Sequence, residues 1–144
     1  MRFLLLFGVL HAACARRARD RLRRMATTIA IIETDGDHSH VQIIGPLDLS
    51  GVQAIELKLL ASTASRRKPA IIDMSQVSFL ASLGIGLLLQ VSRALAADKH
   101  PTVVLSPAAE VEKALRMARL DALLHLAESL EAAQSHARKN TRAH

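Results

Sequence analysis

The sequence is poor in residues that provide stacking surfaces or covalent cross-links. Its 144 residues include no tryptophan, no tyrosine, three phenylalanines and one cysteine. Phe3, Phe7 and Cys14 all precede Met25, so Phe79 is the only phenylalanine in the rest of the chain. Without a stacking platform, binding of exposed nucleic-acid bases is not expected. After Met25 an internal disulfide and a thiolate metal site are both excluded, which is consistent with the reducing cytoplasm where we expect the protein to act.

Positive charge is concentrated near the amino terminus. The net charge is +6, and residues 1–24 alone hold seven arginines and one aspartate. From Met25 onward, twelve basic residues are balanced by twelve acidic ones. This part of the chain therefore lacks the basic excess of a nucleic-acid-binding domain, and we predict no nucleic-acid partner.

Residues 1–24 form a leader that we exclude from the predicted fold. Its hydrophobic run, residues 3–13, is too short to span a bilayer as a helix. The arginines follow this run, whereas a signal peptide places its positive charges first. Residues 10–14 resemble a lipoprotein cleavage site, but His11 stands where a leucine is expected. Since residues 25–27 read like a natural start, we expect an upstream start codon or a disordered extension, and no stable membrane association.

A β-hairpin is predicted at the start of the remaining chain. Residues 28–32 and 41–44 are rich in β-branched side chains, and the Asp-Gly-Asp sequence at residues 35–37 favours a turn between them. His38 and His40 lie close to these aspartates, a composition that metal sites also have. Because polar hairpin tips are more often solvated loops, we predict no metal site and no cofactor.

Helical and strand patterns alternate after the hairpin. Helices are expected at residues 50–65, 83–97 and 129–138 and from residue 107 onward, and strands at residues 70–74, 101–105 and 123–126. Such alternation implies right-handed β-α-β crossovers. We predict a single α/β domain over residues 25–138, with a mixed sheet of four or five strands and helices packed mainly on one face. Residues 139–144 are expected to form a mobile tail.

Serine residues mark the expected helix starts. Ser50 and Gln53 have the spacing of a capping box. Ser106 precedes Pro107, a pattern typical of an N-cap followed by proline at the first helical position. Ser129 is expected to cap the last helix. The helix that begins at Pro107 is expected to bury Val111, Leu115 and Ala118.

The most informative stretch joins a buried strand to a leucine-rich helix. The apolar run at residues 70–74 is typical of a central parallel strand, and the apolar positions 83, 87, 88, 91 and 95 share one face of the following helix. Ser82 lies at the junction, and Gly84 and Gly86 follow it. A hydroxyl there lies beside unpaired amides at the positive helix end, where a phosphate is favoured, although local chemistry alone favours a simple cap. The two glycines would let the helix start approach a strand or a partner backbone closely.

Around this junction the chain resembles the STAS domain family, which comprises anti-sigma factor antagonists and related domains of sulphate transporters. The resemblance rests on Asp73-Met74-Ser75 at the end of the strand and on residues 81–86, where a small residue and a serine precede two alternating glycines. Residues 45–48, with the sequence Gly-Pro-Leu-Asp, and residues 115–120 match as well. It extends over residues 27–133 and implies the same α/β architecture.

The resemblance also implies roles for individual residues. Ser82 matches the serine that is phosphorylated by a partner kinase, which is itself the anti-sigma factor and belongs to the histidine-kinase-like ATPase superfamily. In that scheme the unphosphorylated domain docks on the kinase and frees the sigma factor, and phosphorylation abolishes docking. Many phosphorylatable members have an aspartate before this serine and a serine or threonine after it, whereas this chain has Ala81 and Leu83.

Several neighbouring residues are candidates for contact with that partner. Asp48 matches a family position near the phosphoserine loop, and it is either a partner contact or a turn aspartate. Leu83 and Ile85 would either present apolar surface at the helix start or pack in the core. The predicted partner-binding residues are Asp48, Ala81, Ser82, Leu83, Gly84 and Ile85.

Enzyme motifs are scarce, so we predict a binding module and not an enzyme. His100 and His125 have no thiol or hydroxyl partner at a recognisable spacing, and the two glycines after Ser82 lack the third glycine of a dinucleotide loop. Asp73 at a strand end is more typical of a structural aspartate. We predict an anti-sigma factor antagonist that is a monomer or weak dimer. The alternative is a non-phosphorylated accessory STAS subunit of a transport or lipid-trafficking complex.

Overall fold

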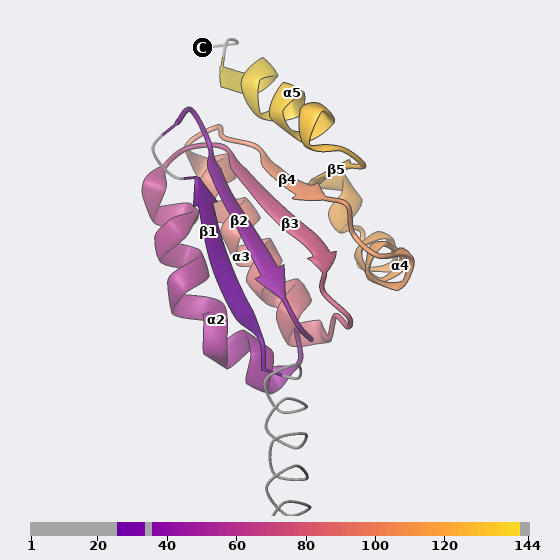
Figure 1. Cartoon of the computed structure of the whole chain (residues 1–144). Coiled ribbons are helices and arrows are strands. Elements are labelled where there is room, and N and C mark those ends of the chain that lie inside the picture. Colours follow the sequence, from indigo (N-terminus) through magenta and orange to yellow (C-terminus); the bar gives the residue numbers. More distant parts are fainter. Residues whose placement is uncertain (1–25, 34–35, 142–144) are drawn as a thin grey trace, which may run out of the picture.

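The computed structural model describes residues 26–33 and 36–141, and the expectations for the leader lie outside these residues. Within the described residues, five strands form one sheet in the order β1-β2-β3-β4-β5. The strands are β1 (Thr28–Glu33), β2 (Ser39–Ile44), β3 (Ala70–Gln76), β4 (Thr102–Leu105) and β5 (His125–Ala127). The helices are α2 (Leu49–Ser62), α3 (Ser82–Ala97), α4 (Ala109–Met117) and α5 (Leu130–Thr141), with 3-10 turns η1 (Ala64–Arg66) and η2 (Leu120–Ala122). The predicted α/β class is confirmed (Figure 1).

The sheet is mixed, as predicted, with one antiparallel pair at its edge. β1 and β2 are antiparallel, and Ile29 lies opposite Ile43. Each later strand joins its neighbour in parallel, so that Ile72 of β3 lies between Val41 of β2 and Val104 of β4. Parallel neighbours need crossover connections, which α2, α3 and α4 provide. The carboxyl ends of β2, β3 and β4 therefore meet at the same edge of the sheet.

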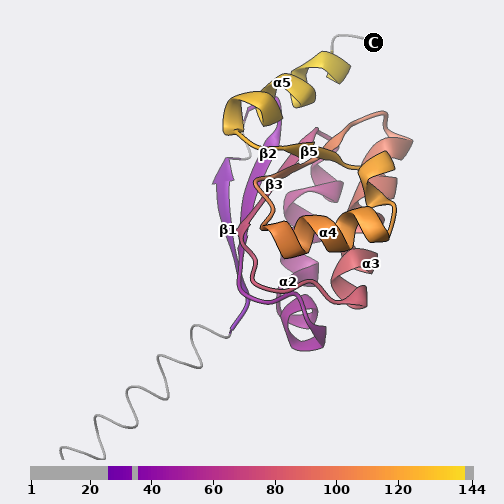
Figure 2. The same cartoon turned by 90° about the vertical axis from the view of Figure 1, so that its right-hand side faces the viewer.

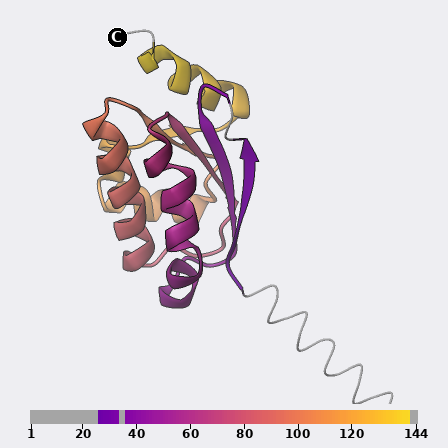
Figure 3. The same ribbon diagram turned by 90° about the vertical axis from the view of Figure 1, so that its left-hand side faces the viewer.

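Helices α2, α3 and α4 cover one face of the sheet and enclose the main core. Each helix directs its apolar side toward the strands: Ile55 of α2, Leu88 of α3 and Leu115 of α4 are at most 1% exposed. Burying a side chain of this size contributes about 1.5–3 kcal/mol relative to exposing it. Figure 3 shows α2 and α3 side by side on this face, with their amino termini at the same end of the molecule.

Among the described helices only α5 packs on the opposite face, so the expectation of helices mainly on one face is confirmed (Figures 1 and 2). Its Ala133 and Ala137 form a second core with Ile71 and Val103 of the central strands. Small alanine side chains allow a helix to approach a sheet closely. At the end of this contact the ring of His125 in β5 stacks on that of His136 in α5, with 5.2 Å between centroids.

The start of α2 differs from the prediction. Asp48, not Ser50, is the N-cap: its Oδ1 accepts the amide of Gly51 at 2.8 Å. Ser50 therefore lies within the first turn, and the expected capping box with Gln53 is wrong. The helix starts at Leu49, three residues after Pro46, where the Leu47 amide donates to the Phe79 carbonyl of the loop that follows β3.

The ends of α4 and α5 also differ from their patterns. α4 begins at Ala109, because Ser106 adopts a left-handed backbone (φ 48°) and donates its hydroxyl to the Glu128 carbonyl, which rules out the expected cap. Ala118, expected to be buried, is exposed beyond the end of α4. The expected cap of α5 is confirmed by the Ser129 hydroxyl, which accepts an amide of the first turn at 3.2 Å. α5 continues to Thr141, past the expected end near Arg138.

The residues expected at a solvated hairpin tip are largely buried. His38 and His40 are only 6% and 7% exposed, and Ser39 is fully buried. The reason is that β2 begins early: the Ser39 amide donates to the Pro69 carbonyl at 2.8 Å and so joins the parallel pairing with β3. Across the described parts of the chain, no group of three or more histidine, cysteine, aspartate or glutamate residues could hold a metal ion.

Candidate functional site

Two loops lie side by side at the carboxyl edge of the sheet and bring the starts of α2 and α3 together. Leu47 and Leu80 form an isolated parallel bridge. The Leu47 amide donates to the Phe79 carbonyl at 2.8 Å, and the Ala81 amide donates to the Leu47 carbonyl at 3.0 Å. Asp48 directly follows Leu47, and Ser82 comes two residues after Leu80. The structure therefore places these two predicted site residues at the adjacent amino termini of two helices.

Asp48 has a definite structural role in this arrangement. It is half-buried, and its carboxylate caps α2 by accepting the Gly51 amide. A charged oxygen at a helix N-terminus is favoured by both the hydrogen bond and the helix dipole. Two roles were considered for Asp48, a partner contact and a turn aspartate. The contacts within the chain account for the second, structural role.

Ser82 is the first residue of α3 and is exposed to solvent, so the expectation that it caps this helix is wrong. The N-cap is Ala81, whose side chain has no hydrogen-bonding group. Among the described residues, the Ser82 hydroxyl has no hydrogen-bond partner. The amides of the first turn thus lack a side-chain acceptor, and the positive end of the helix faces the solvent around Ser82.

Gly84 and Gly86 serve different purposes although they look alike in sequence. A Cβ on Gly84 would lie 2.7 Å from Leu80 Cδ1 and 2.9 Å from Leu47 Cβ, so only glycine lets α3 approach the Leu47 loop this closely. A Cβ on Gly86 would meet nothing within 4 Å. The expected close approach to the chain's own backbone is therefore confirmed for Gly84 and is wrong for Gly86.

Exposed apolar side chains lie on the chain segments next to Ser82. Leu83 is 50% exposed, although its position predicts burial on the apolar face of the helix, and Ile85 is half-buried. Phe79 is 55% exposed and Leu49 is 57% exposed, and neither was among the predicted site residues. We call Leu49, Phe79, Ser82 and Leu83 the Ser82 surface. A sole phenylalanine three residues before the candidate serine was the sequence signal that could have identified Phe79.

Comparison with protein families identifies the fold. A family model described as the STAS domain matches residues 29–133. The chain belongs to the STAS domain family. No curated protein matches the sequence significantly. The STAS match includes the Leu47 loop, the Ser82 surface and all of α3 and α4.

Solved structures with the same STAS fold include antagonists and a transporter. An anti-sigma factor antagonist from Mycobacterium paratuberculosis is 24% identical, with a TM-score of 0.69 over 78% of this chain and 95% of that one. The phosphorylated form of SpoIIAA, a Bacillus cell fate determinant, is 23% identical, with a TM-score of 0.57 over 78% and 100%. The murine anion transporter Slc26a9 is 18% identical, with a TM-score of 0.65 over 93% of this chain and 26% of the transporter.

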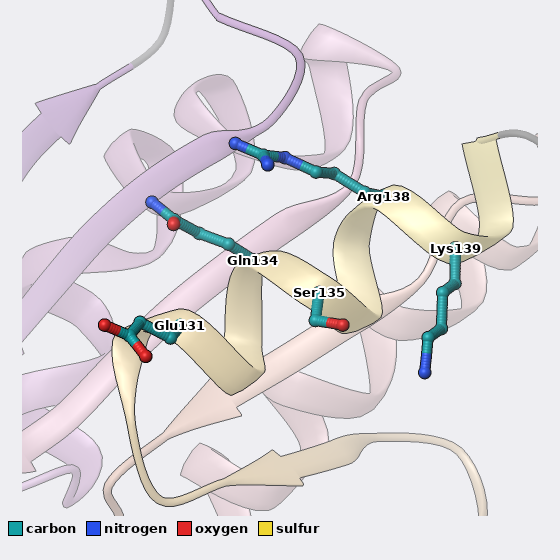
Figure 4. Close-up of a pocket in the computed structure, with 5 residues that line it drawn as sticks. All are labelled: Glu131, Gln134, Ser135, Arg138 and Lys139. Carbon is teal, nitrogen blue, oxygen red and sulfur yellow. The ribbon is translucent and has the colours of Figure 1, made fainter.

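Two depressions on the described part of this STAS domain, on α4 and on α5, are lined by other residues than those of the Ser82 surface. One, of about 470 Å³, lies along α5 on the opposite face of the sheet (Figure 4). Its described lining is Glu131, Gln134, Ser135, Arg138 and Lys139, all from one helix. A depression lined by one helix and open to water lacks the enclosed, convergent polar groups of a typical ligand site.

None of the described helices combines the length and hydrophobicity needed to cross a bilayer.

Proposed function

We propose that this STAS domain is an anti-sigma factor antagonist in a bacterial partner-switching pathway, acting in the cytoplasm. Its Ser82 surface docks on an anti-sigma factor that is also a serine kinase of the histidine-kinase-like ATPase superfamily, and phosphorylation of Ser82 ends the docking. The observation that carries this proposal is an exposed serine hydroxyl, without a hydrogen-bond partner among the described residues, amid exposed Phe79 and Leu83.

The composition of the surface explains why a phosphate would act as a switch. Leu49, Phe79 and Leu83 favour a dry contact, because burial of their exposed area is the main gain on docking. A phosphate on Ser82 adds about −1.5 to −2 charges, which would have to lose their hydration in that contact. Burying an unpaired charge costs far more than a few apolar contacts contribute, so the docked state is lost.

The exposed Ser82 hydroxyl is suited to receive a phosphoryl group from a partner and not to act as a catalytic group of this chain. The Ser82 hydroxyl makes no hydrogen bond to a base among the described residues, so the base and the nucleotide would come from the kinase. Once attached, the phosphate would lie at the positive end of α3, whose first amides lack a side-chain acceptor. This local stabilisation would make the modified state persistent.

A second candidate function is that of a non-phosphorylated accessory subunit of a transport or lipid-trafficking complex, which binds an ATPase. Two observations favour it: Ala81 and Leu83 provide no charge or hydroxyl for a kinase to recognise, and the fold is shared with an anion transporter. The same apolar surface would then serve as a permanent contact. The two functions differ in whether Ser82 acquires phosphate.

The deciding experiment is phosphorylation by candidate kinases. Each histidine-kinase-like anti-sigma factor encoded in the same genome would be incubated with this chain and ATP, and the products analysed by mass spectrometry. We expect one phosphate, which is lost in Ser82→Ala and retained in Ser78→Ala, since Ser78 is an exposed serine of the same loop. A phosphate on another serine, or none with any kinase, would overturn the switch.

A further inference from the structure

Gly86 occupies a helix position where glycine is unfavourable, and no contact with the described residues requires a glycine there. It lies inside α3, where glycine is less favourable than alanine because it loses more backbone entropy on folding. It is exposed, and an added Cβ would meet nothing within 4 Å. One turn earlier on the same side of the helix is Ser82. A glycine in the open beside the Ser82 surface leaves room for another molecule's backbone.

The outward face of α2 is unusually apolar for a helix exposed to water. Leu57 is 83% exposed, more than any other large apolar residue among those described. The only charged residues of α2, Glu56 and Lys58, are each turned about 100° away from it. The uncharged exposed residues of this helix are Leu49, Ser50, Gln53, Ala54, Leu57 and Ala61.

These two features adjoin the Ser82 surface. Leu49, the first residue of α2, belongs both to that surface and to the outward face of α2. Figure 3 shows α2 and α3 side by side with their amino termini at one end, so the two outward faces continue from the Ser82 surface in the same direction. On α4, by contrast, the exposed residues include Glu110, Lys113 and Arg116.

The size of protein interfaces requires such an extension. A stable specific contact buries roughly 800 Å² on each partner and engages about 20–30 residues. The Ser82 surface has four residues, so a partner docked there must also cover neighbouring surface. Charged residues are depleted at the centre of interfaces, which favours extension along the uncharged strip of α2 and the first two turns of α3, before the exposed Arg93, over extension across α4.

We infer that the anti-sigma factor docked at Ser82 also covers the outward faces of α2 and α3, placing its main chain over Gly86 and apolar side chains against Leu57. This inference rests on the proposed function, because it extends the same interface. The exposed Gly86 then makes room for the partner's backbone, and Leu57 supplies apolar contact area on a different helix from the modified serine.

The test uses purified full-length chain and the kinase-type anti-sigma factors of the same genome, with affinity measured by calorimetry. Gly86→Leu should weaken binding at least tenfold while the unfolding midpoint stays equal or rises, because the added side chain enters open space. Leu57→Glu should also weaken binding at least tenfold. The controls are Ala109→Leu and Met117→Glu on α4, the latter at a residue that is 76% exposed, and neither should change the affinity.

The outcomes separate the inference from the proposed function. If Ser82→Asp abolishes binding but Gly86→Leu and Leu57→Glu bind as the unmodified chain does, the inference is overturned and the function stands. If the unmodified chain binds none of the anti-sigma factors, the function itself fails. A dimer of this chain that Leu57→Glu dissociates would assign the face of α2 to a second copy, which would also overturn the inference.

Discussion

Gly84 lies so close to Leu47 that a Cβ added to the glycine would stand 2.9 Å from the Cβ of the leucine. This contact holds the start of α3 against the loop before α2. Gly84→Ala should therefore destabilise the fold by about 1–3 kcal/mol, the usual cost of overpacking. Gly86→Ala is the matched control: it should leave stability unchanged or raise it by up to about 1 kcal/mol. Urea unfolding of both variants measures the difference, and equal effects would contradict the packing described.

Substitutions of Asp48 can separate its role as the cap of α2 from the role of its negative charge. Asp48→Ala removes the acceptor of the Gly51 amide and should cost about 1 kcal/mol of stability, whereas Asp48→Asn keeps a good cap and should cost little. Ser50→Ala should lie within about 0.5 kcal/mol of the unmodified chain, since Ser50 is exposed within the helix. A larger loss for Ser50→Ala than for Asp48→Ala in thermal unfolding would restore the capping box. If Asp48→Asn is stable but binds the anti-sigma factor less well, the carboxylate charge acts in docking.

Phe79 should be a binding residue and not a stability residue. It is 55% exposed, so Phe79→Ala should change the free energy of unfolding far less than the loss of a buried phenylalanine would. At the centre of an apolar contact the same change should cost more than about 1 kcal/mol of binding free energy. Leu130→Ala, at an exposed leucine on α5, is the control and should bind normally. Normal binding of Phe79→Ala would remove the Ser82 surface from the interface.

The contact between β5 and α5 should weaken in acid. Burial lowers the pKa of His125, and the charge of the stacked His136 lowers it further. The unfolded chain therefore binds the proton more readily, so stability is fully present above the ordinary histidine pKa of about 6.5 and is lost as the pH falls through it. The thermal midpoint should drop between pH 7.5 and pH 5, and less so in His136→Gln. An equal drop in His136→Gln would contradict the stacking contribution.

The order of strands and helices could be predicted because it depends on patterns that persist over many residues. β-Branched runs at residues 28–32 and 70–74 and the leucine spacing after residue 83 each repeat one preference several times. The single sheet and its crossovers follow from that alternation. A close approach was predicted for both Gly84 and Gly86, because glycine has no side chain, but the sequence could not show that only Gly84 lies against the Leu47 loop.

The details of the site could not be predicted, because single tertiary contacts decide them. Whether Asp48 or Ser50 caps α2 depends on the bridge between Leu47 and Leu80, which fixes where the chain turns. Beside that bridge Ala81 is the N-cap of α3, and the Ser82 hydroxyl has no hydrogen-bond partner among the described residues. The exposure of Leu83 could not be predicted either, because the spacing of apolar residues in one helix does not show where the neighbouring helix ends.

The central claim is that a phosphate on Ser82 changes affinity for the anti-sigma factor. The most direct measurement compares the unmodified chain with a chain carrying phosphoserine at position 82, both titrated against the same purified anti-sigma factor. We predict that the unmodified chain binds and that the phosphorylated chain binds at least a hundredfold more weakly, with equal unfolding midpoints. Equal affinity of the two forms would contradict the account.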